Sequence, residues 1–276
     1  MSGITGEDRR TAVGRLPALG SGLFTSRSRR RVRALAGAEF ALLGRNRSAV
    51  ATALLVPLAL PFSVRPAIDQ AGFRDVNLGT LMLTAAIGFS FLFAVYTSLV
   101  SAYVARREEL VLKRLRTGEP TDVEILGGTA LPAVCLGLAQ ALVLALGCAV
   151  LLDAGAPRAP WLTVLGLLTG LPLSAALAAL TSVFTRTTES AQVTALPMVV
   201  VSMIGSGIAL PTDLLPHRAA AVCEFLPLSP AVRLVRAGWT GELTAYEAFG
   251  TVLTALAWTV VAVFAVRRWF RWEPRR

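Results

Sequence analysis

Residues 78–104 read LGTLMLTAAIGFSFLFAVYTSLVSAYV, a run that contains no charged residue. An α-helix rises about 1.5 Å per residue, so this run is long enough to cross the roughly 30 Å hydrocarbon core of a bilayer. It is followed directly by ARREELVLKRLR, residues 105–116, in which charges of both signs are crowded together. The run therefore predicts a transmembrane helix that ends at a charged membrane surface.

Other apolar runs of the same character lie before and after this one. They cover about Ser48–Val64, Gly128–Leu152, Trp161–Phe184, Ser190–Leu210 and Ala245–Val266. The first is short and contains two prolines, which predicts a kink. The chain is 54% hydrophobic and its mean hydropathy is +0.63, beyond the usual range of soluble domains. The sequence thus predicts an all-α membrane protein with six transmembrane helices.

The basic residues decide the orientation, because loops rich in Arg and Lys stay in the cytoplasm. If both termini are inside, the inner segments hold ten cations before the first span, five between the second and third, Arg186, and five in the tail, against six in the outer loops. We therefore expect cytoplasmic termini, with Trp269 and Trp272 as aromatic anchors at the inner interface. Residues 1–28 are expected to be a disordered basic tail and not a cleaved signal peptide.

A helix lying along the membrane surface is expected ahead of the first span, at about residues 29–44. Phe40 falls on an apolar face at helical spacing, while Arg29, Arg31 and Arg33 supply positive charge. Basic amphipathic helices of this kind bind the headgroup region of a bilayer. A solvated basic tail that only obeys the orientation rule is the alternative.

Composition argues against several soluble functions. The net charge is +10, and Lys113 is the only lysine among 27 cations. Nucleic-acid binding is disfavoured, because the arginines sit at the ends of apolar runs and not on one soluble face. Cys135 and Cys148 lie too far apart along one predicted helix to form a disulfide, and Cys223 and His217 have no neighbours that suggest a metal site. We expect these residues to be core or surface residues, with no metal bound.

The groups that drive chemistry or ion coupling are missing from the predicted spans. Lys113 follows Leu112 without the glycine-rich turn of a P-loop, so the chain is expected to hydrolyse no ATP itself. The span interiors contain no Asp, Glu, Lys, Arg or His, whereas proton-coupled transporters keep such groups near the bilayer midplane. No serine has a base placed to activate it. The protein is therefore passive, structural, or driven by a partner.

Two connections are too long to be simple turns. The inner one, residues 105–127, predicts a charged helix over Arg106–Arg116 with Glu109 and Lys113 as an i, i+4 pair, and then a new helix start at Thr121 with a capping box. This favours a docking element over a solvated loop. The outer one, residues 211–244, alternates apolar stretches with Pro and Gly, which predicts short helices that are partly re-entrant.

Four stretches together resemble the permease subunits of ABC-2 type exporters, such as drug and polyketide efflux systems. The inner connection carries Glu108, Lys113, Leu115, Arg116 and Pro120, similar to the loose family pattern E-x-x-x-x-K-x-L-R-x-x-P, although the residues before the proline depart from it. The stretches are AEFALLGRNRSAV (38–50), REELVLKRLRTGEPTDVEILGGTAL (107–131), TRTTESAQVTALPMVVVSMIGSGIALP (185–211) and FLPLSPAVRLVRAGWTGE (225–242).

The resemblance implies a six-span permease domain over residues 29–276 in a cell membrane, of the bacterial type. It implies two facing permeases, as a homodimer or with a paralogue, each resting on a separate ABC ATPase subunit that binds the ATP and Mg²⁺. A hydrophobic or amphipathic drug-like cargo is expected; export of a lipid or glycan-lipid, an ABC-like importer or channel, and a membrane anchor without transport are the alternatives. The residues expected to contact the ATPase are Arg107, Glu108, Glu109, Lys113, Arg114 and Arg116. Those expected to line the pathway are Thr97, Gln192, Thr194 and Ser202.

Overall fold

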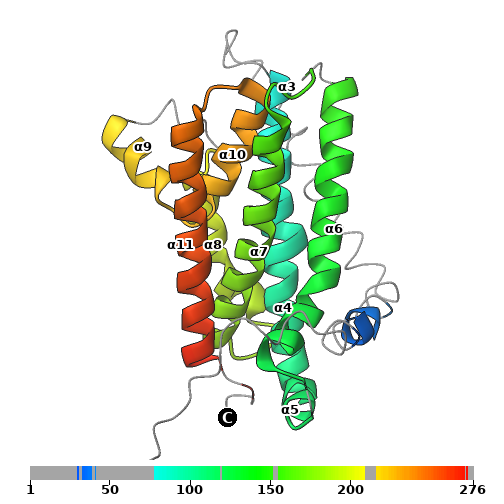
Figure 1. Ribbon diagram of the computed structural model, residues 1–276. Coiled ribbons are helices and arrows are strands. Elements are labelled where there is room, and N and C mark those ends of the chain that lie inside the picture. The colour runs from blue at the N-terminus through cyan, green and yellow to red at the C-terminus, as the bar shows by residue number, and fades with distance from the viewer. Residues whose placement is uncertain are drawn as a thin grey trace, which may run out of the picture.

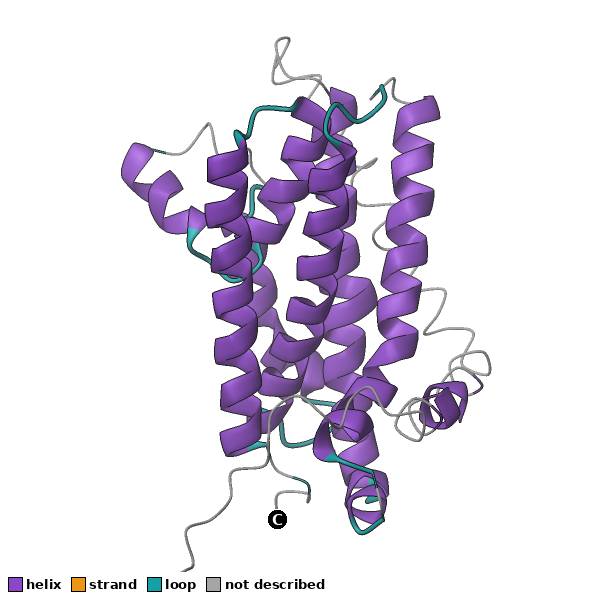
Figure 2. Ribbon diagram, in the orientation of Figure 1, coloured by secondary structure: helices purple, strands orange, loops and turns teal. Residues whose placement is uncertain are grey.

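The computed structural model describes residues 30, 33–38, 41, 78–118, 120–151, 155–208, 216–270 and 272. Within these ranges every regular element is a helix, and most helices run side by side (Figures 1 and 2). The elements are α3 (Leu78–Phe89), η1 (Ser90–Thr97), α4 (Ser98–Glu108), α5 (Val111–Arg116), α6 (Asp122–Leu151), α7 (Pro160–Phe184), α8 (Ala191–Gly205), α9 (His217–Glu224), α10 (Ser229–Thr240) and α11 (Ala245–Trp269). The predicted first span, 48–64, and the predicted tail, 1–28, lie outside the described residues.

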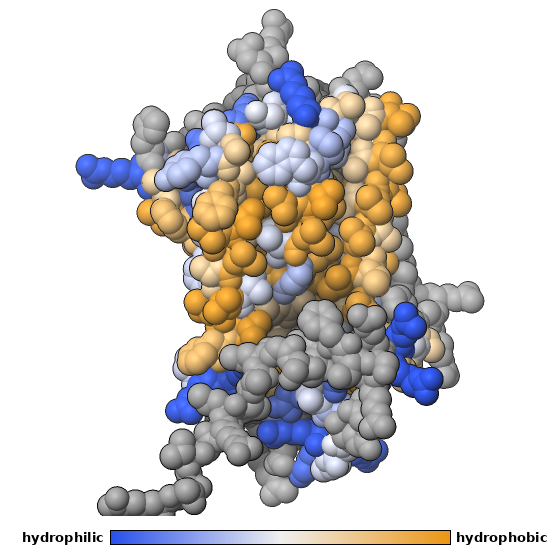
Figure 3. Space-filling view, in the orientation of Figure 1, coloured by the Kyte–Doolittle hydropathy of each residue, from blue (hydrophilic) through white to orange (hydrophobic). Residues whose placement is uncertain are grey.

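Four of the described helical segments are long and apolar enough to cross a membrane. They are Gly79–Glu108, which joins α3, η1 and α4, together with α6, α7 and α11. On the face of the bundle seen in Figure 3, apolar side chains form a broad band with hydrophilic residues beyond it at both ends. The chain is therefore an all-α, multi-pass membrane protein, as predicted. The second, fourth and sixth predicted spans coincide with α3–α4, α7 and α11 to within a few residues.

The run α3–η1–α4 lies at the centre of the bundle. In its most apolar window 89% of the residues are buried, against 33% for α6 and 28% for α11. Its middle segment η1 is a π-helix, a rare form inside long helices. Here the Ser90 hydroxyl donates to the Gly137 carbonyl of α6 at 3.2 Å, and the Tyr96 hydroxyl lies 3.0 Å from that of Thr181 on α7. The π-helix is thus enclosed by α6 and α7.

Helix α10 packs into a groove on α7 that is made by two glycines. Gly166 and Gly170 are four residues apart, the small-xxx-small spacing that lets helices approach closely. A Cβ atom added at Gly166 would lie 2.9 Å from the Ala231 carbonyl oxygen and 3.0 Å from the Val235 nitrogen. The backbone of α10 therefore fills the space that a side chain at Gly166 would need.

The predicted fifth span, Ser190–Leu210, is shorter in the structure. Helix α8 has 15 residues, about 22 Å at the α-helical rise, which is less than the hydrocarbon thickness. The turn after α8 contains Gly207 with a φ of 68°, a left-handed conformation that glycine adopts without strain. The periodicity of the sequence did not reveal this stop, because apolar residues continue to Leu210.

Helices α9 (His217–Glu224) and α10 (Ser229–Thr240) are the short helices expected in the outer connection, and we call the pair the re-entrant unit. The indole nitrogen of Trp258 donates to the Phe225 carbonyl, in the turn between α9 and α10, at 2.8 Å. Trp258 lies thirteen residues after Ala245, the first residue of α11, which is about 20 Å along that helix. The turn therefore reaches the middle of the bundle, and α10 returns from there to the end where α11 begins (Figure 1).

The end of the bundle where α11 finishes carries most of the described basic residues, and we call it the inner end. Lys113, Arg114 and Arg116 on α5 lie there, as do Arg267 and Arg268 in the last turn of α11. Beside this end, residues 33–38 form a short helix that is seen nearly end-on in Figure 1, so it crosses the direction of the spans. This is the orientation expected of a surface helix. Of its predicted residues Arg33 is exposed, while Arg29, Arg31 and Phe40 lie outside the described residues.

The predicted continuous helix over Arg106–Arg116 is wrong. Helix α4 ends at Glu108, Leu110 adopts a left-handed conformation with a φ of 58°, and α5 then begins at Val111. Glu109 lies before this break and forms an ion pair with Arg106 at 2.9 Å, so it does not share one helix with Lys113 as predicted. A left-handed leucine is uncommon and no sequence pattern announces it.

The predicted helix start at Thr121 is confirmed, and it lengthens the third span. The Thr121 amide donates to the Glu124 carboxylate at 2.8 Å, and the Glu124 amide donates to the Thr121 hydroxyl at 3.4 Å. This reciprocal pair is a capping box. Helix α6 therefore begins at Asp122 and not near Gly128.

Candidate functional site

Arg107 is a buried cation that joins two helices at the inner end. Only 1% of the surface of Arg107 is exposed. The guanidinium donates to the carbonyl oxygen of Ser182 at 2.9 Å and to those of Thr185 and Arg186. These carbonyls belong to the last turn of α7 and the residues after it, where a helix has acceptors without partners and a partial negative charge. Arg107 thus caps α7 from α4.

The next residue, Glu108, extends this contact to the connection between α7 and α8. Its carboxylate accepts from the Thr188 amide at 3.3 Å and from the Thr188 hydroxyl. Two consecutive residues at the end of α4 therefore bind the 182–188 segment through six hydrogen bonds. We call this set of contacts, Arg107 and Glu108 with Ser182, Thr185, Arg186 and Thr188, the inner clamp.

Helix α5 carries the exposed charges of the inner end. Leu112 is fully buried and fixes one side of the helix, while Lys113, Arg114 and Arg116 are exposed. Arg116 also forms an ion pair with Asp122, the first residue of α6, at 3.4 Å. Since α5 follows α4 after only two residues, any force on α5 acts close to the inner clamp.

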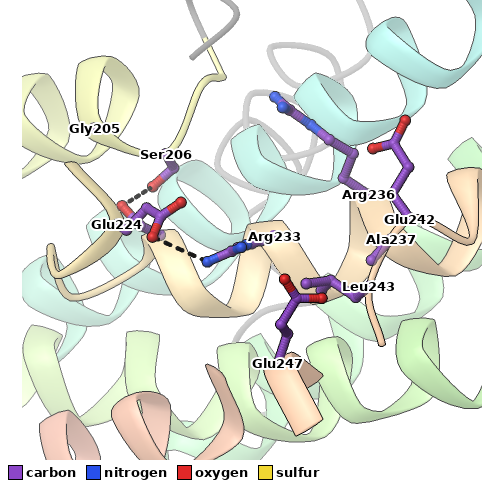
Figure 4. A pocket seen from close by; sticks show the side chains of 10 residues that line it. Gly205, Ser206, Glu224, Arg233, Arg236, Ala237, Glu242, Leu243 and Glu247 are labelled. Carbon is purple, nitrogen blue, oxygen red and sulfur yellow. Dashed lines mark hydrogen bonds and ion pairs between the residues drawn. The ribbon is translucent and has the colours of Figure 1, made fainter. Parts of the chain in front are cut away.

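A second polar feature lies in the outer half of the bundle. A cavity of about 230 Å³ is lined by charges of both signs at the meeting of α8, α9, α10 and α11, shown in Figure 4. Glu224 and Arg233 form an ion pair at 3.1 Å, with each side chain about half exposed. Glu224 directly precedes the turn that is hydrogen-bonded to Trp258. The ion pair therefore lies near the middle of the bundle, measured along α11. The sequence prediction of a charge-free interior holds for the four long helices but misses the re-entrant unit. The lining residues are Gly205, Ser206, Glu224, Ser229, Arg233, Arg236, Ala237, Glu242, Leu243 and Glu247.

Most of the features described above lie within a segment that matches one protein family. The family model for the ABC-2 type transporter matches residues 30–239, which is more than half of the chain. This chain belongs to the ABC-2 type transporter family. The match includes the surface helix, the inner clamp, α5 and the re-entrant unit. A comparison with curated proteins found no match.

Members of this family are transporter components. Among the described residues, no group of three His, Cys, Asp or Glu side chains is placed to hold a metal ion. Cys148 and Cys223 are buried and Cys135 is exposed, and all three are free thiols.

The predicted contact residues of this ABC-2 chain divide into two groups. Glu108, Glu109, Lys113, Arg114 and Arg116 are exposed or partly exposed at the inner end. Arg107 is buried, so its own side chain offers no surface to a partner, and its guanidinium contacts the end of α7 instead. The sequence does not distinguish these residues from one another. Arg107 is buried because α7 ends beside it, and this contact between distant parts of the chain leaves no local pattern.

The predicted pathway residues lie on two elements, with Thr97 at the end of η1 and the other three on α8. Thr97 and Thr194 donate their hydroxyls to carbonyls one turn back, those of Phe93 and Ser190, at 3.1 and 2.9 Å. Gln192 is exposed near the start of α8 and donates to Ser101 at 3.4 Å. Ser202 is fully buried ten residues further on, about 15 Å along α8. Nothing in the structure assigns these four residues to a single pathway.

Proposed function

We propose that this chain is the transmembrane permease subunit of an ABC exporter, driven by ATP that a separate nucleotide-binding subunit hydrolyses. The observation that carries the proposal is α5. It is a short basic helix exposed at the inner end, anchored by Leu112 and placed next to the clamp that joins α4 to α7 and α8. A helix held in this way can receive movement from a partner and pass it into the spans.

The inner clamp supplies the route for that movement. A shift of α5 displaces the end of α4, because only Glu109 and Leu110 lie between the two helices. Arg107 and Glu108 then carry α7 and the start of α8 with them through the hydrogen bonds to Ser182 and Thr188. Packed helices shift as rigid bodies between discrete arrangements. A movement at the inner end would therefore tilt the spans around the buried α3–α4 run.

We propose an amphipathic cargo. The long spans are apolar and uncharged in their interiors, which suits the apolar part of such a molecule. The cavity in the outer half, lined by Arg233, Glu224 and Glu247 among others, suits its polar part on the way out. A lipid or glycan-lipid has the same amphipathic character and remains an alternative cargo. The exposed apolar faces of α6 and α11 would contact lipid and a second permease copy.

The proposal is tested by reversing the charge of α5. We expect the double variant Lys113→Glu, Arg114→Glu to fold normally, because both side chains are exposed. It should lower the permease-dependent stimulation of the co-purified ATPase by at least about ten-fold, since each reversed charge turns an attraction into a repulsion at a docking surface. The measurement is the ATP hydrolysis rate of the reconstituted pair in liposomes, with and without the permease.

The matched control is Arg267→Glu, Arg268→Glu, which makes the same change of charge at the same end but on α11. This control should keep most of the stimulation. If the α5 variant and the α11 variant lose stimulation equally, α5 is not the docking element. If no ATPase co-purifies with the full chain, the role of a membrane anchor without transport replaces that of a permease.

A further inference from the structure

The segment after α11 returns to the bundle and contacts α4. The Phe270 amide donates to the Val266 carbonyl at 2.8 Å, which closes the last turn of α11. The Phe270 ring then packs edge-on against the ring of Tyr103, with 6.5 Å between the centroids. Tyr103 is buried on α4 and donates its hydroxyl to the Leu126 carbonyl of α6 at 3.0 Å. Phe270 therefore rests on a site where α4 and α6 are already joined.

Trp272 continues this contact onto α5. Its ring packs edge-on against that of Phe270, with 5.0 Å between the centroids. The guanidinium carbon of Arg116 lies over the Trp272 ring, 4.9 Å from its centroid. This is the geometry of a cation–π contact. A chain of aromatic rings thus runs from Tyr103 to Arg116, the last residue of α5.

The ion pair of Arg116 alone would not fix the end of α5. Arg116 and Asp122 are 53% and 52% exposed, and ion pairs this open to solvent contribute little to stability. The Trp272 ring holds the guanidinium from a second side and limits the directions in which the long side chain can point. With Asp122 and Trp272 together, the side chain is held by α6 and by the segment after α11.

We propose that Trp272 is a positioning residue that holds Arg116, and with it the last turn of α5, in the orientation that meets the partner ATPase. This inference rests on the proposed function for the identity of the partner. It replaces the sequence-based role of Trp272 as a membrane anchor. Trp269 keeps that role, because it is 57% exposed on the last turn of α11, whereas Trp272 turns toward α5.

The test compares full-length variants by hydrogen–deuterium exchange of peptides that cover residues 111–118. We expect Trp272→Ala to raise amide exchange there by roughly two- to five-fold, the range for losing a partly exposed cation–π contact. Trp272→Phe should restore exchange to near the wild-type rate, because it keeps an aromatic face. Trp269→Ala is the matched control and should leave the 111–118 peptides unchanged.

The functional arm uses ATP hydrolysis by the co-purified ATPase. Trp272→Ala and Arg116→Ala should each lower permease-dependent stimulation, and the double variant should be no worse than Arg116→Ala, because residues in one contact are not additive. The proposal is overturned if Trp272→Ala leaves exchange at 111–118 unchanged, if Trp269→Ala raises it as much, or if the double variant shows fully additive loss. If exchange rises as expected but Arg116→Ala leaves stimulation intact, Trp272 still orders the end of α5, but the proposed contact of Arg116 with the ATPase is overturned. The docking role of α5 itself is then decided by the Lys113→Glu, Arg114→Glu variant.

Discussion

Replacing Arg107 by methionine is expected to remove the Arg107 hydrogen bonds of the inner clamp and to abolish the coupling between the partner ATPase and the spans. The change keeps an unbranched apolar stem but removes every donor, so the carbonyls of Ser182, Thr185 and Arg186 lose a buried partner. Each buried acceptor left unsatisfied costs about 1–3 kcal/mol. The loss of the positive charge at the end of α7 adds to this cost. We expect a thermal midpoint lowered by several degrees and little remaining ATPase stimulation.

Two matched variants separate the clamp from a general effect of charge. Arg106→Met removes the neighbouring arginine, which forms an ion pair with the exposed Glu109, and should change the thermal midpoint far less. Arg107→Lys keeps the charge but has no planar fork to reach several carbonyls at once, so it should give partial rescue. The measurements are thermal unfolding of the full chain in detergent and ATP hydrolysis by the reconstituted pair. Equal effects of Arg106→Met and Arg107→Met would contradict a specific clamp.

Gly166→Leu is expected to disrupt the packing of α10 against α7. Even a Cβ atom at this position would meet backbone atoms of α10 at 2.9 and 3.0 Å. Backbone cannot move aside as a flexible side chain can, so α10 must shift as a whole. Overpacking of a well-packed site costs about 1–3 kcal/mol, and occasionally more. We expect a large loss of folded protein, measured as the monodisperse fraction in size-exclusion chromatography after solubilisation.

The control for this prediction is Gly147→Leu on α6. Gly147 also lies within a membrane-spanning helix, but a Cβ atom there meets nothing within 4 Å. The same change of residue should therefore be tolerated, with a small gain where glycine is replaced in a helix. If both variants fold equally well, the glycine groove of α7 does not hold α10.

The long helices were predictable because their signal is local. The lengths of apolar runs such as 78–104 and 161–184 can be read directly from the sequence. The capping box at Thr121 indicates the start of α6 within four residues. Only the boundary of the membrane span was placed near Gly128, because hydropathy ignores the polar first turn of the helix. Short helices in the outer connection were also predictable from the alternation of apolar stretches with Pro and Gly.

What could not be predicted depends on contacts between distant parts of the chain. Arg106 and Arg107 are adjacent and look alike in the sequence, but one pairs with an exposed carboxylate and the other is buried against α7. The left-handed Leu110 breaks a stretch of good helix formers, and α5 then begins with the side chain of Leu112 fully buried. The depth of the α9–α10 turn is set by Trp258, thirty-three residues from its acceptor Phe225.

The π-helix between α3 and α4 has a further consequence for the two halves of the central span. A π-helix spreads its hydrogen bonds over five residues, so it contains about one residue more than an α-helix of the same number of turns. One extra residue rotates everything after it by about 100° around the helix axis. Ser90–Thr97 therefore sets the rotational phase of α4 independently of α3. The outer half can face α6 and α10 while the inner half aims Arg107 at the end of α7.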